Sequence, residues 1–94
     1  MPVPTGIDFK DFLKAVPILA RKKGFIPKFY PTRGSAIRFE LFNNKTDTEP
    51  AKMWVVHEDK REKKVYSDDL KKACKEIGVS KKDFEDLIKR KFKL

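Results

Sequence analysis

Apolar residues at helical spacing predict a helix near the start of the chain. Between residues 8 and 23 they recur every third or fourth position and form one face, while most of the lysines and arginines lie off it. Asp8 suits an N-cap and Gly24 a C-terminal stop. Pro17 removes one backbone donor, so we expect either a kink near Leu13 or a break into two short helices.

The pattern then changes to the two-residue period of strands. Residues 36–42 alternate between two faces, and residues 25–30 form a preceding strand whose Pro27 predicts a position at the edge of a sheet. The segment Pro31-Thr32-Arg33-Gly34 suits a tight turn, with Gly34 in the left-handed conformation that closes a bulged hairpin. Together these segments predict a β-hairpin.

A third strand is predicted over residues 53–57, after a polar surface loop at residues 43–50. Its apolar residues are continuous. Either both of its faces are at least partly covered, or Trp54 lies on an exposed face where its ring is available for binding. A charged turn follows, and residues 63–66 suit a short fourth strand.

Two helices are predicted at the C-terminal end of the chain. Ser67-Asp68-Asp69 starts the first helix, and Gly78 stops it. Ser80 and Asp83 have the spacing of a weak capping box, which opens the last helix.

The whole pattern predicts an α+β fold in the order α-β-β-β(-β)-α-α. We expect a two-layer sandwich in which helices pack on one face of an antiparallel sheet of three, or four, strands. The length suits one domain over residues 1–94, with residues 1–7 as a loose N-terminal tail.

The charge balance favours a polyanionic partner. The 94 residues include 23 lysines and arginines against 14 acidic residues, a net charge of +9, and such a field attracts nucleic acid. The alternative is a lysine-rich surface that binds nothing. Abundant lysine and glutamate without glutamine also suit a heat-adapted organism.

Composition argues against several other classes of protein. No apolar run approaches the roughly 20 residues of a membrane span, and the N-terminal segment has no secretion signal, so we expect a cytoplasmic protein without membrane contact. One cysteine, Cys74, and one histidine, His57, make neither an intrachain disulfide nor a zinc cluster. We therefore expect no metal site and no cofactor.

The hairpin and its neighbours resemble the HicA-type toxins, a family of small mRNA interferases with a fold like that of double-stranded-RNA-binding domains. Gly24-Phe25 is similar to the family's helix end, and Gly34-Ser35-Ala36 to the turn that opens its second strand. The likeness extends from about residue 8 to residue 90. The family has its catalytic histidine where this chain has Ala36, which neither accepts nor donates a proton. Ser35 and His57 are left as weak catalytic candidates.

Double-stranded-RNA-binding domains also resemble the chain directly. The final helix of such a domain begins with lysines that bind phosphates across a groove, and Lys71, Lys72 and Lys75 look similar. Asp68 and Asp69, however, lie in the first turn of the same helix and would repel phosphate. This resemblance implies recognition of RNA by its shape and its 2′-hydroxyls.

These observations favour a non-catalytic nucleic-acid-binding module that prefers RNA to DNA. Cations on the hairpin and on the helix after the sheet would bind phosphates, and aromatic rings would stack on bases. The predicted phosphate contacts are Lys28, Arg33, Arg38, Lys71, Lys72 and Lys75, and the predicted stacking residues are Tyr30 and Trp54.

Three other functions stay open. Residues 67–91 also resemble a helix-turn-helix DNA binder. A ribonuclease could use His57 in place of the missing histidine. A protein-interaction module could pair its edge strand at residues 25–30 with a partner, although prolines protect such an edge. In the helix-turn-helix alternative, the cations that approach DNA would be Lys81, Lys82, Lys89 and Arg90.

Overall fold

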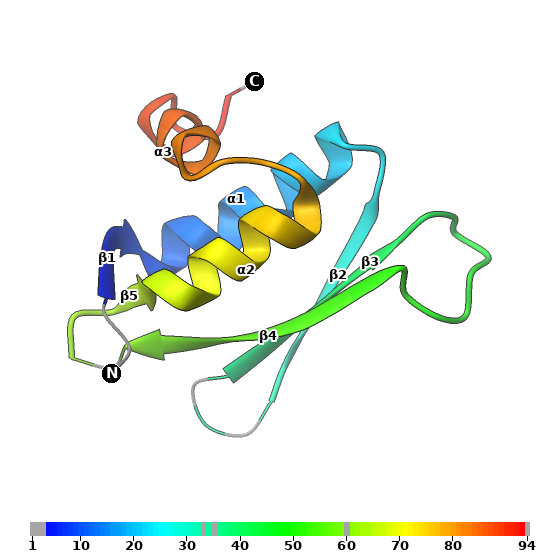
Figure 1. Cartoon of the computed structure of the whole chain (residues 1–94), viewed down its shortest axis with the longest axis horizontal. Helices are drawn as coiled ribbons and strands as arrows, with labels where there is room; N and C mark the ends of the chain where they lie inside the picture. Colours follow the sequence, from blue (N-terminus) through cyan, green and yellow to red (C-terminus); the bar gives the residue numbers. More distant parts are fainter. Residues whose placement is uncertain (1–3, 33, 35, 60, 94) are drawn as a thin grey trace.

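A computed structural model describes residues 4–32, 34, 36–59 and 61–93 (Figure 1). Its strands form one antiparallel sheet in the order β1-β5-β4-β3-β2. No helix within the described ranges is long and apolar enough to cross a bilayer. The elements are β1 (Pro4–Asp8), α1 (Phe9–Lys22), β2 (Ile26–Pro31), β3 (Ala36–Phe42), β4 (Lys52–Asp59), β5 (Lys64–Tyr66), α2 (Ser67–Ile77) and α3 (Lys81–Lys89).

The helices lie on one side of the sheet (Figure 1). α1 and α2 pack directly on the strands, and α3 packs mainly against α1 and α2, farther from the sheet. The prediction of an α+β sandwich with helices on one face is confirmed, as is the short fourth strand, β5. α1 continues through Pro17 as a single helix, so the predicted break into two helices does not occur.

The expectation of a loose tail over residues 1–7 is wrong for its described part, because β1 begins at Pro4. β1 pairs with β5 at the edge of the sheet and makes it five-stranded. The Thr5 hydroxyl donates to the carbonyl of Val65 at 2.8 Å, Lys64 forms an ion pair with Asp8, and Ile7 is buried. These contacts stabilise a strand whose sequence has no alternating pattern.

Phe12 of α1 lies at the centre of the core and is fully buried. Its ring meets Phe39 of β3 edge-on, with centroids 6.0 Å apart, and stacks on Phe84 of α3 at 5.4 Å. One side chain therefore joins the sheet, the first helix and the last helix.

The prolines of β2 occupy the free edge of the sheet. Thr32 N–H donates to the carbonyl of Ala36 at 3.0 Å, so alternate residues of β2 point their backbone groups at β3. Residues 27, 29 and 31 then face away from β3, and Pro27 and Pro31 have no N–H to offer there. Between these two prolines only Phe29 presents a donor, which protects the edge from pairing with a further strand.

Phe12→Ala should lower the free energy of unfolding by about 3–5 kcal/mol, because it opens a cavity between three elements. Urea unfolding followed by circular dichroism would measure the loss. Tyr30→Ala, on an exposed ring, is the control and should cost much less. Equal losses in the two variants would contradict the central place of Phe12.

Candidate nucleic-acid interface

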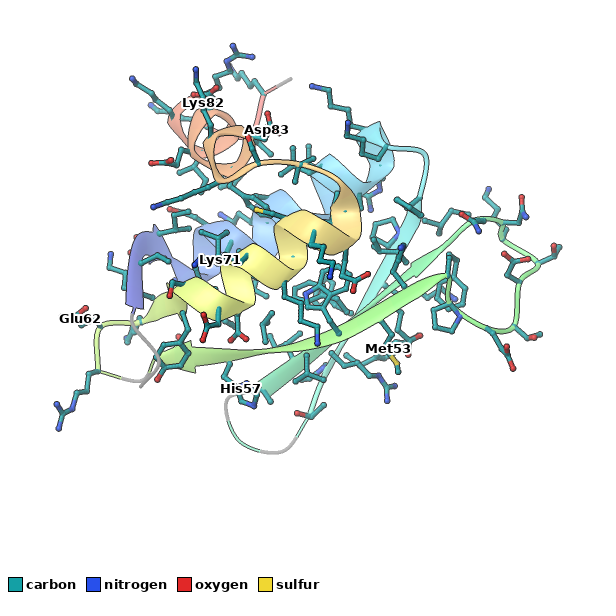
Figure 2. All side chains as sticks on the ribbon, viewed as in Figure 1. Met53, His57, Glu62, Lys71, Lys82 and Asp83 are labelled. Carbon is teal, nitrogen blue, oxygen red and sulfur yellow. The ribbon has the colours of Figure 1, made fainter. Side chains whose placement is uncertain are left out.

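The two faces of the sheet differ in what covers them. The inner face carries Phe39, Trp54 and Val56, which are buried beneath the helices. None of the described helices covers the outer face. Figure 2 shows Met53 and His57 on the side of β4 that points away from α2.

Strand register brings three of the predicted contacts together on the outer face. One cross-strand row is Tyr30, Arg38 and Val55, and the next is Lys28, Glu40 and Met53. The exposed fractions are 39% for Tyr30, 40% for Val55 and 55% for Met53, which is high for residues inside a sheet. We call the surface formed by Lys28, Tyr30, Arg38, Met53 and Val55 the platform.

Cations lie against aromatic rings on the platform. The Arg38 guanidinium is 5.1 Å from the centroid of the Tyr30 ring, and Lys28 Nζ is 5.0 Å from that of Phe42. Arg38 Nε also lies 3.1 Å from a carboxylate oxygen of Glu40 in an ion pair, and 43% of the Arg38 side chain stays exposed. The result is a surface with apolar and cationic groups side by side, suited to contact with a planar ring.

His57 lies at the end of the outer face, directly across from Ala36 in the pairing of β3 with β4. Its backbone N–H donates at 2.8 Å to Asp69 Oδ2 in the first turn of α2. The register of β4 with β5 is given by Glu58 with Val65 and Asp59 with Lys64, and at His57 the backbone donor is taken by this carboxylate. The same oxygen is 4.0 Å from His57 Nδ1, and the imidazole is 58% exposed. The other catalytic candidate, Ser35, lies outside the described residues.

Trp54 is not exposed, so the alternative that its ring lies on an exposed face of the sheet is wrong. Its exposed fraction is 2%, and its ring stacks on Phe39 with centroids 5.4 Å apart. β4 is covered on its inner face by α2, and Trp54 points to that face. It cannot stack on a base without unfolding of the core.

The remaining predicted contacts lie elsewhere. Lys71, Lys72 and Lys75 are exposed on α2, and Figure 2 shows Lys71 on the opposite side of the sheet from Met53 and His57. The structure therefore does not bring these lysines together with the platform. Arg33 lies outside the described residues.

The helix-turn-helix alternative meets a local constraint. In α3, Asp83 accepts a hydrogen bond from Ser80 N–H at 2.8 Å, and its own N–H donates to the Ser80 hydroxyl at 3.2 Å. Asp83 is therefore needed to begin the helix and leaves a negative charge on the surface that would face DNA. The four cations predicted for that role are exposed: Lys81, Lys82, Lys89 and Arg90.

Most of the excess positive charge belongs to the helices together with the residues that directly follow α1 and α3. Residues 9–23, 67–77 and 81–93 contain fourteen lysines and arginines against seven carboxylates, whereas the rest of the chain contains nine against seven. The strands and loops taken together are thus close to neutral, while the helices and the residues after α1 and α3 are strongly basic. A ligand with both planar rings and negative charge suits such a protein.

Met53 and Val55 are platform residues that sequence reasoning missed. The alternation along β4 could have revealed them. Met53 and Val55 alternate with Trp54 and Val56, so burial of Trp54 and Val56 on one face leaves Met53 and Val55 on the other. Their continuous apolar run concealed it.

Comparisons and side-chain chemistry offer no other site. The chain matches no protein-family model, no curated protein and no solved structure. Among the described residues, no group of three or more histidine, cysteine or carboxylate side chains is placed to hold a metal ion.

Trp54 fluorescence should be insensitive to ligands, because its ring is enclosed by the core. We expect emission at short wavelength, weak quenching by acrylamide, and no added quenching by RNA. A Trp54→Phe, Tyr30→Trp double variant, which moves the indole to the platform, is the comparison and should be quenched by RNA. Strong acrylamide quenching of the parent protein would show that Trp54 is accessible after all.

Proposed function

We propose that the protein binds single-stranded nucleic acid through the platform and prefers RNA to DNA. The observation that carries this proposal is the Arg38 guanidinium over the exposed ring of Tyr30, on a sheet face that none of the described helices covers. Base stacking on aromatic rings and on guanidinium planes contributes about 1–3 kcal/mol per base.

The composition of the platform favours an unpaired strand over a duplex. A duplex hides the faces of its bases and presents phosphates, so it would meet Met53 and Val55 without any apolar contact in return. An unpaired base can cover these side chains with its ring while its phosphate approaches Lys28. The platform would therefore recognise the faces of unpaired bases, not the shape of an RNA duplex.

RNA is the preferred ligand because unpaired loops and ends are the usual targets of sequence-specific RNA recognition. Each ribose also carries a 2′-hydroxyl, which donates and accepts hydrogen bonds. Glu40 and Arg38 offer both an acceptor and donors beside Tyr30.

Tyr30→Ala should weaken binding of a short single-stranded RNA by about 1–3 kcal/mol, because one stacking partner is lost. Fluorescence anisotropy with a labelled oligonucleotide, at two salt concentrations, would measure it. Tyr30→Phe keeps the ring and should bind nearly as the parent protein does. DNA of the same sequence and an RNA duplex should bind more weakly than the single-stranded RNA. Equal affinity for the duplex, or no loss in Tyr30→Ala, would contradict the platform.

A metal-independent ribonuclease is the second candidate function. The observation in its favour is the exposed imidazole of His57, 4.0 Å from Asp69 Oδ2 and across from Ala36. A carboxylate close to an imidazole can orient the ring for proton transfer. His57 would take the proton of the 2′-hydroxyl, whose oxygen attacks the adjacent phosphate, and water would return a proton to the leaving oxygen.

His57→Ala tests that candidate separately from binding. If the parent protein cleaves RNA, the products should carry 2′,3′-cyclic phosphates, and the variant should lose cleavage but bind as before. DNA should stay intact because it has no 2′-hydroxyl. Gel electrophoresis of an end-labelled RNA, with a chelator present, measures both effects. Intact RNA after long incubation with the parent protein would leave binding as the function.

A further inference from the structure

A second cationic surface lies where the C-terminal ends of α1 and α3 meet. Lys22, Arg90 and Lys93 line one cavity of about 220 Å³, together with Leu19 and Leu87. Arg21 and Lys22 line a neighbouring cavity of about 460 Å³ with Ile18 and Phe92. We call the surface formed by Arg21, Lys22, Lys23, Arg90 and Lys93 the basic end.

The segment after α3 is held in place against its backbone preference. Lys91 and Phe92 both have positive φ, at 54° and 66°, a left-handed conformation that costs non-glycine residues free energy. Phe92 N–H donates to the carbonyl of Leu87 at 2.9 Å. The Phe92 ring packs against the core, and Lys14 Nζ lies 5.5 Å from its centroid. This packing turns the chain back onto α1 and places Lys93 near Lys22.

The charge at the basic end is only partly compensated. Two carboxylates, Asp83 and Asp86, line the same cavity as Lys22. The hydrogen bond from Ser80 N–H lowers the pKa of Asp83 most, and the charges of Lys22 and Lys23 lower it further. Helix C-termini favour nearby cations, but five cations against two carboxylates leave a net positive surface. A polyanion would relieve their mutual repulsion.

The free edge of β2 connects the basic end with the platform. Lys23 caps α1, and Lys28 of the platform follows five residues later, which an extended chain spans in about 17 Å. Phe29 lies on this edge on the same face as Phe39, with its centroid 6.0 Å from the Phe39 ring, yet it is 50% exposed. The edge therefore presents a half-exposed aromatic ring next to Lys28, on the face of the sheet opposite the platform.

We propose that one continuous nucleic-acid strand occupies both surfaces, with its bases on the platform and its phosphates further along on the basic end. The nucleic acid passes around the β2 edge beside Phe29. This inference rests on the proposed function, since it extends the ligand of the platform. It assigns the basic end to backbone contacts, which add affinity without reading sequence.

Length and salt dependence distinguish the two surfaces. We would compare an RNA of about four nucleotides with one of about twelve, the range of known single-strand sites. The parent protein should bind the longer RNA at least about tenfold more tightly, and with a steeper salt dependence, because about 0.7 counterions are released per phosphate neutralised on a single strand.

The test variant is the triple substitution Lys22→Ala, Arg90→Ala, Lys93→Ala. It should lose the gain for the longer RNA and keep the affinity for the short one. The matched control is Lys71→Ala, Lys72→Ala, Lys75→Ala on α2, which removes the same charge and should keep the gain. Phe29→Ala should reduce the gain in affinity for the longer RNA and leave the affinity for the short RNA unchanged. Circular dichroism checks that each variant is folded.

The outcomes separate the claim about the basic end from the claim about the platform. A longer RNA that binds the parent protein no more tightly than the short one overturns the second surface and leaves the platform intact. Equal loss in the basic-end triple and in the α2 triple also overturns it, because the effect is then one of net charge. If the parent protein binds neither RNA, both the platform and the basic end are refuted.

Discussion

The packing of Phe12 between Phe39 and Phe84 fixes the arrangement of the whole molecule. Because this one ring contacts both β3 and α3, the last helix is held above the first helix and away from the strands. All three helices thus gather on one face of the sheet (Figure 1). The described residues form no further helix that could cover the other face. The exposed platform follows from the way the core is built.

The structure separates two properties that nucleic-acid binding needs. Aromatic and apolar groups lie on the sheet, at Tyr30, Met53 and Val55, and most of the net positive charge lies on the helices and the residues that directly follow α1 and α3. A charged surface draws a polyanion from a distance and holds it loosely in many positions. A stacking surface acts only at contact and favours particular positions of the strand. In the proposed function, the helical side would attract the nucleic acid and the platform would orient it.

Sequence patterns predicted the elements whose side chains alternate or recur within a single segment. Residues 36–42 have a clear two-residue period, and α2 has a clear helical one. β1 has no such pattern and forms only because β5 lies beside it, so its segment could not be recognised alone. Trp54 was ambiguous because a continuous apolar run does not say which face is covered. The basic end joins Lys22 to Lys93, and only the tertiary structure shows that neighbours so distant in sequence meet.

The prolines of β2 have a consequence for molecules that share one ligand. Proteins bound side by side on a single strand are held at high local concentration, where weak contacts between them are strengthened. Sheets with open edges would then join into larger assemblies. With Pro27 and Pro31 on its outward positions, the β2 edge has few donors for such contacts. If the protein binds RNA as proposed, neighbouring copies on one RNA can therefore crowd together at this edge and still separate when the RNA is released.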